Sequence, residues 1–474
     1  MNKNIYIGTP IYYANGAPHL GHFLTTTAAD VLARYYRLLL GSDNVFFTTG
    51  LDEHGTTVEQ SAIKAGYTSD SFQKYVDKRA EEWRKSFKDT NISFDYFVRT
   101  TDPSHEKFAQ EFIRKMVNKG DVYQGKYKGK YCNGCEKFLT LSDQSEDGYC
   151  PLHRPDQTIE IEEDNYFFKL SSYAPKIKQL IEENKIKITP TNKKQDILSR
   201  LVNKIDDISI SRPKEKVSWG VGFPDDSNQT VYVWVEALIH YRSSLAINNK
   251  TDFQENTVHM LGKDINWFHN VIWPSFLLST NLPLYKNSFV HSFLIVNGAK
   301  ISKSLGNAIS PTELSLQFGI DGARFLMLKN FPFENDTDVN LEFLTERYNA
   351  DLANGLGNTV SRVAKLAENS GLEFSTEDLR WFDEVKSSLE EYRFDKAIEK
   401  IWSELTQVDQ RINLEKPWEL QGDTLQVKLI SYIKSIRQIA FNLKPFLPQT
   451  AGKIEAQFKG SKIKASSPLF PRLQ

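Results

Sequence analysis

The fold of this chain is decided by residues 10–22, which read Pro-Ile-Tyr-Tyr-Ala-Asn-Gly-Ala-Pro-His-Leu-Gly-His. The stretch follows a short β-prone run at residues 5–7 and precedes residues 23–40, where apolar side chains recur at helical spacing. Asn15-Gly16 marks a turn between the two. We therefore predict a strand, a turn and a helix. In a parallel α/β sheet this junction lies at the carboxyl end of a strand, where ligands bind.

Three residues at the start of the predicted helix, His19, Gly21 and His22, are candidates for binding phosphate. A helix N-terminus attracts phosphate through its free N–H groups and its dipole. Imidazole N–H groups add donors, and Gly21 allows a nucleotide to approach the backbone closely. An isolated pattern this short more often reflects capping and packing. A second candidate makes phosphate binding the better interpretation here. It is Lys300-Ile-Ser-Lys-Ser304, far downstream, which offers ammonium and hydroxyl donors for a triphosphate.

Strand-like and helix-like runs alternate along the first 115 residues, which indicates a doubly wound parallel sheet. After a helix end at Gly41, residues 44–49 are predicted to form a second buried strand that leads into the polar loop 50–56. Asp52 in this loop would ordinarily be a turn or cap residue.

The same pattern returns in the second half of the chain. A strand is predicted to run from Val231 to Trp234, with a helix after it. Another strand ends near Gly262, and residues 266–278 are predicted to be helical. A last strand-like run, residues 292–296, leads through a turn at Asn297-Gly298 to the lysine-serine loop.

Length and composition indicate a globular protein of two or three domains, because a chain of 474 residues is too long to fold around a single hydrophobic core. There is no apolar run long enough to span a bilayer and no secretory signal pattern, so we expect a cytoplasmic location. The net charge of −1 gives no general reason to bind nucleic acid. Two local basic patches are candidates, although each alone is more simply a solvated surface: Arg114, Lys115, Lys119, Lys126, Lys128 and Lys130, and Lys453, Lys459, Lys462 and Lys464.

A candidate zinc site interrupts the alternation between residues 116 and 215. It comprises Cys132 and Cys135, then Cys150 and His153, and it uses all 3 cysteines of the chain. Three thiolates and one imidazole suit tetrahedral zinc. Four protein ligands leave no open position, so a structural metal is expected.

Beyond about residue 305 the sequence is helical in character. Asn358 and Arg362 lie one turn apart on a predicted helix, and Pro417-Trp418 follows another. Taken alone, such a pair is usually part of an ordinary surface.

His-Leu-Gly-His followed by Lys-Ile-Ser-Lys-Ser resembles the signature pair of class I aminoacyl-tRNA synthetases. With the flanking residues the resemblance extends to the methionyl-tRNA synthetase family, over nearly the whole chain and in a form with one zinc knuckle. Ile301 stands where the family usually has Met. The resemblance implies an α/β fold: a Rossmann-like doubly wound parallel sheet, an inserted zinc-knuckle connective domain and a C-terminal all-α anticodon-binding bundle.

The resemblance also implies domain boundaries and an oligomeric state. The expected parts are the first catalytic half (1–115), the connective insertion (116–215), the second catalytic half (216–304), a linking segment (305–345) and the anticodon-binding domain (346–474). The insertion is too short for a large editing domain. No dimer-forming C-terminal extension is seen, so a monomer is expected.

By position, the resemblance assigns His19, His22, Lys300 and Lys303 to catalysis. ATP would be bound by His19, Gly21, His22, Gly262, Asp264 and Lys303. Asp52 would bind the α-amino group of methionine. The side-chain pocket would be formed by Ile11, Tyr13, Trp234, Ala237, Leu238, Tyr241, Ile265, His269 and Ile272. Asn358, Arg362 and Trp418 would read the anticodon.

The implied reaction joins methionine to tRNA(Met) through a methionyl-adenylate, with Mg²⁺ accompanying ATP and one structural zinc per chain. Leu238 and Ile272 depart from some relatives, which have Pro and Phe there, and such changes retune discrimination by only about 1–3 kcal/mol. Three alternatives stay open: another class I synthetase such as a leucyl, valyl or cysteinyl enzyme, a small-molecule nucleotidyltransferase, and a non-catalytic tRNA-binding relative.

Overall fold

The computed structural model describes the chain except for residues 1–3, 141–142, 297–298, 301–308, 332 and 377. Its backbone forms two compact units. The first unit comprises Met1–Pro18, Asp43–Lys88 and Phe94–His291, and the second comprises His19–Ser42, Asp89–Ser93 and Ser292–Gln474.

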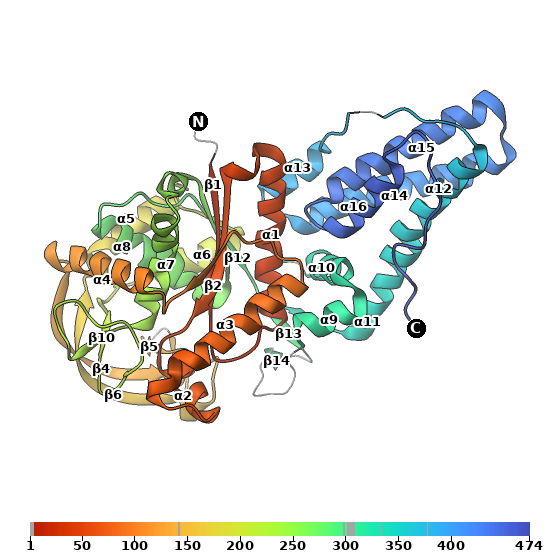
Figure 1. Cartoon of the computed structure of the whole chain (residues 1–474). Helices are drawn as coiled ribbons and strands as arrows, with labels where there is room; N and C mark the ends of the chain where they lie inside the picture. The colour runs from red at the N-terminus through yellow and green to blue at the C-terminus, as the bar shows by residue number, and fades with distance from the viewer. Residues whose placement is uncertain (1–3, 141–142, 297–298, 301–308, 332, 377) are drawn as a thin grey trace. The chain divides into compact units, whose positions relative to one another are not determined.

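A six-stranded parallel sheet forms the centre of the first unit (Figure 1). The strand order reverses between β1 and β11, so the predicted doubly wound topology is confirmed and its switch point lies at these two strands. Ligands of such sheets bind beyond the carboxyl ends of the strands at this point. In spatial order the strands are β3 (Tyr96–Arg99), β2 (Val45–Asp52), β1 (Ile5–Tyr13), β11 (Thr257–Gly262), β12 (Asn287–His291) and β7 (Lys187–Thr189).

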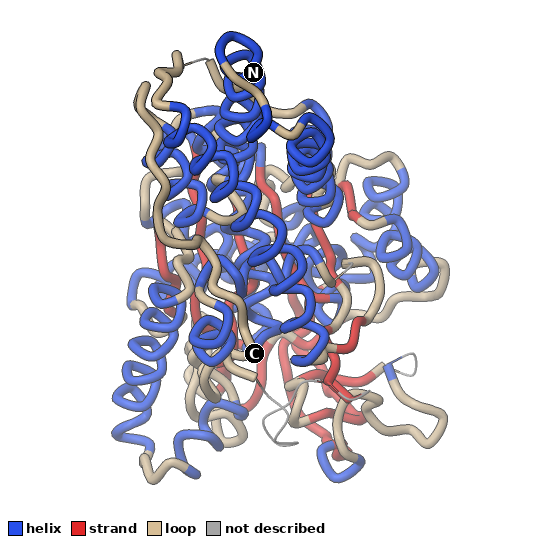
Figure 2. Tube along the Cα trace, turned by 90° about the vertical axis from the view of Figure 1, so that its right-hand side faces the viewer, coloured by secondary structure: helices blue, strands red, loops and turns tan. Residues whose placement is uncertain are grey.

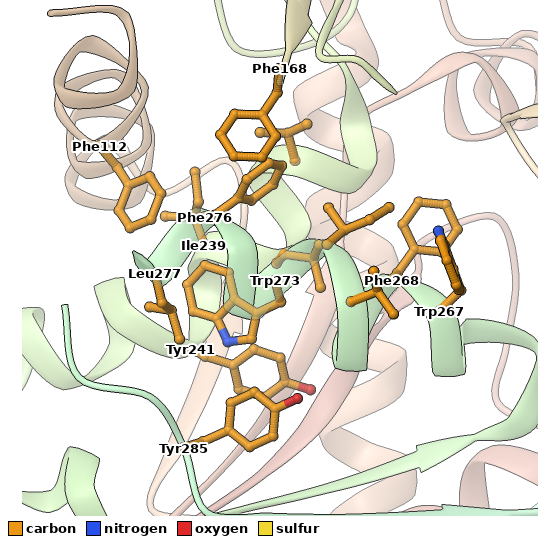
Figure 3. Packing of buried hydrophobic residues seen from close by; sticks show 14 of the residues in the cluster. Phe112, Phe168, Ile239, Tyr241, Trp267, Phe268, Trp273, Phe276, Leu277 and Tyr285 are labelled. Atoms are coloured by element: carbon orange, nitrogen blue, oxygen red, sulfur yellow. The ribbon is translucent and has the colours of Figure 1, made fainter. Parts of the chain in front are cut away.

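Buried aromatic side chains unite the helices of this unit with the sheet (Figure 3). Trp273 stacks on Phe112 at 5.9 Å between ring centroids, and Phe276 meets Phe168 edge to face at 4.9 Å. The helices are α2 (Thr56–Lys64), α3 (Phe72–Asp89), α4 (Pro103–Asn118), α5 (Leu170–Glu182), α6 (Thr191–Arg200), α7 (Val233–Ile247) and α8 (Trp273–Ser279).

An antiparallel subdomain begins between α4 and α5 and is completed by short strands that follow α6. Its main feature is a long ladder between β4 (Val122–Cys132) and β6 (Thr158–Phe168). The remaining strands are β5 (Lys137–Leu139) and β8 (Ile208–Ser209) in the same sheet, and β9 (Ser211–Pro213) with β10 (Gln229–Val231) in a two-stranded sheet.

The second unit combines the helix that follows the His-Leu-Gly-His motif with the C-terminal part of the chain. A small sheet contains β13 (Leu294–Val296), β14 (Ala299–Lys300) and β15 (Thr337–Asp338). The helices are α1 (Leu20–Leu40), α9 (Pro311–Phe318), α10 (Ile320–Lys329), α11 (Leu341–Arg347), α12 (Asn358–Ser370), α13 (Asp383–Glu390), α14 (Phe394–Glu415), α15 (Gly422–Leu443) and α16 (Pro448–Phe458).

The tail after α16 runs back along these helices (Figures 1 and 2). It is pinned near its end by Asn349, whose side chain exchanges two hydrogen bonds of 2.9 and 2.8 Å with the backbone of Leu473.

A buried ion pair attaches α1 to the rest of the second unit. Asp30 and Arg324 have side chains with 0% exposure and lie 2.7 Å apart. Arg34 and the backbone N–H of Ser93 also bond to Asp30, each at 2.7 Å. Burial alone would raise the pKa of Asp30, but Arg324 and Arg34 hold it below the ordinary value.

Strand β2 runs to Asp52, three residues into the predicted loop 50–56. Three other details differ from the sequence predictions. The strand predicted to reach Trp234 ends at Val231, and Trp234 lies in the first turn of α7. The helix predicted for residues 266–278 contains a π-helical turn, Phe268–Ile272, just before Pro274, which has no N–H to give to the preceding turn. The third difference is strand β7, which the sequence analysis did not identify.

Among the described helices, none combines the length and apolar character needed to cross a membrane.

Candidate functional site

The amino end of α1 is organised by its two histidines. His19 is the N-cap residue, and its Nδ1 accepts from the backbone N–H of Gly21 at 3.1 Å. The backbone N–H of His19 in turn donates to Nδ1 of His22 at 3.2 Å. The two rings stack with centroids 3.7 Å apart. Because both Nδ1 atoms accept, the proton of each neutral ring resides on Nε2, which becomes a donor at the helix N-terminus.

Ile309, which follows the undescribed residues 301–308, contacts the same helix end. The backbone N–H of Leu20 donates to the carbonyl oxygen of Ile309 at 3.2 Å. Of Lys300 only the backbone is described, in β14, where it pairs with Ile295. Lys303 lies outside the described residues.

A buried carboxylate and a phenol stand side by side at the carboxyl ends of β1 and β2. Tyr13 and Asp52 are partners in the parallel register, and Asp52 is 3% exposed. Neither Oδ1 of Asp52 nor the hydroxyl of Tyr13 has a hydrogen-bond partner among the described residues. Burial, followed by the charges of Glu236 and Glu136, holds the pKa of Asp52 well above its ordinary value. A ligand with an ammonium group would satisfy both atoms and restore the charge balance.

Contacts from several segments hold the loop after Asp52. His54 and Glu236 form a buried ion pair at 2.7 Å. Glu53 is paired with Arg99 at 2.7 Å, and its carbonyl oxygen accepts from the indole N–H of Trp219 at 2.6 Å. These contacts fix the loop and therefore the direction of the Asp52 side chain.

Aromatic rings form one part of the predicted methionine pocket. Trp234 stacks on Phe268 at 4.2 Å and meets Tyr13 edge to face at 6.0 Å. Tyr241 stacks on His259 at 3.9 Å, and Figure 3 shows its hydroxyl on the same side as that of Tyr285.

His269 provides a neutral polar atom beside these rings. Its ring meets Tyr241 edge to face at 5.7 Å, and its Nδ1 lies 3.0 Å from the carbonyl oxygen of Ile265. Burial lowers the pKa of His269 to about 4. The ring is therefore neutral near pH 7, with Nδ1–H as donor and Nε2 as acceptor.

The other predicted pocket residues are apolar and mostly buried. Leu238, Tyr241 and Ile272 belong to the main core cluster, and Tyr13, Trp234 and Ile265 pack against it. Ala237 is 6% exposed, and Ile11 is half-buried at the end of β1.

The predicted ribose-binding pair lies at the switch point. Gly262 ends β11, and Asp264 follows in a single 3₁₀ turn. Oδ1 of Asp264 lies 2.9 Å from the position that a Cβ on Gly262 would occupy. Any larger residue at 262 would require this carboxylate to move.

The four candidate zinc ligands converge. Their donor atoms all lie within 4.8 Å of one another. Nδ1 of His153 is 3.2 Å from Sγ of Cys135 and 3.6 Å from Sγ of Cys132, and the Sγ atoms of Cys135 and Cys150 are 3.6 Å apart. Tetrahedral zinc with bonds of about 2.0–2.3 Å holds such atoms about 3.5–3.8 Å apart. The set therefore fits zinc, with Nδ1 as the imidazole ligand.

Hydrogen bonds join this zinc knuckle, residues 132–153, to the pocket. The indole N–H of Trp234 donates to the carbonyl oxygen of Cys135 at 3.2 Å. The hydroxyl of Tyr232 donates to the carbonyl oxygen of Glu136 at 2.5 Å. The sequence analysis singled out neither Tyr232 nor Glu136.

The three predicted anticodon-reading residues lie in the second unit. Asn358 is exposed at the start of α12. Arg362 is held by Asp409 at 2.5 Å and by Asn413 at 2.7 Å, both on α14. Trp418 follows that helix and is 57% exposed. An exposed indole can stack on an unpaired base, and a restrained guanidinium can hydrogen-bond to one.

The predicted basic patches are partly neutralised. Arg114 pairs with Asp225 at 3.1 Å, and Lys128 pairs across the ladder with Glu162 at 3.5 Å. Lys462 pairs with Glu373 at 3.3 Å. These contacts favour the ordinary surface interpretation.

Comparisons with known proteins identify the family. A family profile described as tRNA synthetases class I (M) matches residues 5–158 and 155–364. A methionine–tRNA ligase of Thermotoga maritima is 38% identical over 475 residues, which cover 95% of this chain and 74% of that protein. The chain belongs to the methionyl-tRNA synthetase family. A second relative, the methionine–tRNA ligase of Caldanaerobacter subterraneus, is 35% identical and covers 100% of this chain and 79% of its own length.

A solved methionyl-tRNA synthetase has the same fold. The Mycobacterium tuberculosis enzyme in complex with methionyl-adenylate superposes with a TM-score of 0.90 at 30% identity, covering 99% of this chain and 100% of that one. The α/β fold class and the assignment as an aminoacyl-tRNA ligase are thereby confirmed.

The residues that the sequence analysis missed are mainly buried supports of the candidate site. They are His54, Glu136, Trp219, Tyr232, Glu236, His259, Phe268 and Tyr285. Only Glu136 had a local signal, because it directly follows a predicted zinc ligand.

Proposed function

We propose that this chain activates methionine with ATP and transfers it to tRNA(Met). In the first step a methionine carboxylate oxygen attacks the α-phosphate of ATP, and pyrophosphate leaves. In the second step the terminal adenosine hydroxyl of tRNA attacks the acyl carbon, and AMP leaves. Reactions of this kind depend on positioning and charge stabilisation more than on covalent catalysis.

In this proposal, Asp52 and Tyr13 bind the α-amino group. The supporting observation, which carries the proposal, is the pair of buried oxygen atoms that lack a partner among the described residues. A bound ammonium would lower the pKa of Asp52 back toward its ordinary value and form a charged hydrogen bond.

The methionine side chain is assigned to the aromatic and apolar pocket. His269 is neutral and offers Nε2, and Tyr241 carries a buried hydroxyl with no partner among the described residues. A thioether is a weak acceptor, so shape is expected to dominate selection. The apolar part of this assignment comprises Ile11, Trp234, Ala237, Leu238, Ile265 and Ile272.

ATP binding is assigned to the residues predicted for it from the sequence. His19, Gly21 and His22 would hold phosphates at the amino end of α1, where two Nε2–H donors and the helix dipole favour negative charge. Gly262 and Asp264 would hold the ribose. Lys300 and Lys303 would neutralise the leaving pyrophosphate, and Mg²⁺ bound with ATP would supply further charge neutralisation.

Recognition of tRNA is assigned to Asn358, Arg362 and Trp418 in the anticodon-binding domain, 346–474. The other proposed domains are those stated above, 1–115, 116–215, 216–304 and 305–345. Cys132, Cys135, Cys150 and His153 would hold one structural zinc, which would brace the knuckle. We further propose a cytoplasmic monomer.

Methionine-dependent ATP–pyrophosphate exchange tests the proposal. Methionine alone among the standard amino acids should support exchange, and Asp52→Asn should raise the KM for methionine strongly. Exchange that depends on another amino acid would favour a different class I synthetase. Exchange without any amino acid would favour a nucleotidyltransferase.

A further inference from the structure

Glu136 directly follows the candidate zinc ligand Cys135, yet its carboxylate contacts the start of α2, a few residues after Asp52. The residue is 1% exposed, and its Oε1 accepts from the backbone N–H of Thr57 at 2.6 Å. Its two carboxylate oxygens lie 2.8 and 2.9 Å from the position that a Cβ on Gly55 would occupy. Gly55, with φ of 92°, thus leaves the space that the carboxylate fills.

Helix α2 depends on this contact for a side-chain cap. Its N-cap residue is Gly55, which has no side chain and provides no cap hydrogen bond. A carboxylate at a helix N-terminus satisfies a free N–H and interacts favourably with the dipole. Glu136 therefore caps a helix from a segment far away in sequence, and that helix begins shortly after Asp52.

The backbone of the same segment accepts hydrogen bonds from two residues at the start of α7. The carbonyl oxygen of Glu136 accepts from the hydroxyl of Tyr232, and that of Cys135 accepts from the indole of Trp234. Glu136 adopts the left-handed backbone conformation, with φ of 47°. Its carbonyl oxygen bonds to Tyr232 at the start of α7, whereas its carboxylate bonds to the start of α2. One residue thus links the loop of Asp52 with the start of α7.

We propose that Glu136 is a positioning residue of the amino-acid site. By capping α2 it fixes the loop that aims Asp52 at the α-amino group of methionine. This inference rests on the proposed role of Asp52 as the partner of that group.

The test measures KM for methionine and for ATP in pyrophosphate exchange. Glu136→Ala should raise the KM for methionine about five- to tenfold, as expected for the loss of one cap. The KM for ATP should change less than twofold. Glu136→Gln should stay close to the parent, because its amide oxygen still accepts from Thr57. The zinc content of each variant, measured by elemental analysis, should remain at the parent level.

Two further measurements separate positioning from general stabilisation. Asp102→Ala removes another N-cap in the same unit, the acceptor 2.8 Å from the N–H of Ser104, and should leave both KM values unchanged. The α-hydroxy analogue of methionine has no ammonium group, so its inhibition constant should be the same in Glu136→Ala and the parent.

Thr57→Pro covers the case in which Glu136→Ala loses its zinc or fails to fold. It deletes the donor N–H at the second position of α2, where no intrahelical hydrogen bond is lost, together with the hydroxyl contact to the carbonyl oxygen of Asn133, and should reproduce the rise in KM. The inference is overturned if neither substitution changes the KM for methionine, or if Asp102→Ala changes it equally. If Asp52→Asn also leaves the KM for methionine unchanged, the proposed role of Asp52 fails as well. If Asp52→Asn raises this KM but the substitutions at Glu136 and Thr57 do not, only the role of Glu136 is overturned.

Discussion

The backbone N–H of His19 donates to Nδ1 of His22 at 3.2 Å, across one turn at the amino end of α1. The two histidines therefore cap the helix and also present hydrogen-bond donors. Their Nδ1 atoms satisfy free N–H groups of the helix, and their Nε2 atoms are left as the protonated donors.

This division of roles predicts different outcomes for two substitutions of His22. His22→Asn keeps an acceptor near the Nδ1 position but lacks the Nε2–H donor. Its free energy of unfolding should match that of the parent, while kcat in pyrophosphate exchange should fall about 10²–10³-fold. His22→Gln, whose amide reaches the Nε2 position, should retain more activity. Full activity in His22→Asn would contradict the role of Nε2.

Gly134 of the zinc knuckle is predicted to be essential for metal binding. A Cβ at this position would lie 2.5 Å from Cδ2 of His153, so Gly134→Ala should push the imidazole away from the cysteines. Elemental analysis after gel filtration should show loss of stoichiometric zinc. Gly222→Ala is the matched control, because its nearest neighbouring atom would be 3.8 Å away. Zinc retained at the parent level in Gly134→Ala would rule out His153 as a ligand in this geometry.

Gly8 of β1 makes room for the ring of Tyr241. A Cβ there would lie 2.7 Å from Cε1 of that ring. Gly8→Ala should therefore lower the free energy of unfolding by about 1–3 kcal/mol. Displacement of the ring should also raise the KM for methionine roughly tenfold. Gly452→Ala in α16, where the new methyl group would point into open space, should instead stabilise slightly and leave KM unchanged.

The buried pair of His54 and Glu236 predicts a pH-dependent contribution to stability. Burial opposes the charged form, but Glu236 first, then Glu106 and Glu53, raise the pKa of His54 above its ordinary value. The pair should therefore stabilise fully below the unfolded-state pKa of about 6.5, and lose this effect as pH rises through the higher folded-state value.

The measurement compares the parent with His54→Gln in denaturant unfolding at several pH values. The difference in free energy should be about 1.5–3 kcal/mol at pH 6 and smaller at pH 9. Besides the three carboxylates, the ring of Trp219 faces the imidazole at 5.3 Å and does not titrate. A difference that grows with pH would contradict the assignment.

The parts of the fold that were predictable from sequence have strong local signals. Residues 5–40 combine a β-prone run, an Asn-Gly turn and helical periodicity, and they form β1 and α1 as predicted, with Gly41 ending the helix. The candidate metal ligands of the knuckle could be predicted because cysteines and histidine at this spacing have few other uses. Their convergence within 4.8 Å is confirmed.

The missed parts depend on contacts between distant segments. Val231 to Trp234 has a strand composition, but packing places Trp234 in a helix, so local propensity was overridden. Strand β7 is short and becomes recognisable only through its pairing with β12. The proposed roles of the site residues stay predictions, whereas the supports around Asp52 could not be found because each involves a partner far away in the chain.

The buried pair of Asp30 and Arg324 has a practical consequence for dissecting this enzyme. The helix that presents the two histidines is built into the same compact unit as the C-terminal helices, although it lies near the start of the polypeptide. Cutting the gene after the last sheet strand would strip this helix of its neighbours and leave a carboxylate without its innermost cation. A minimal activation fragment cannot be obtained by simple C-terminal deletion at that point, and any miniaturised version must retain α10 or replace its arginine.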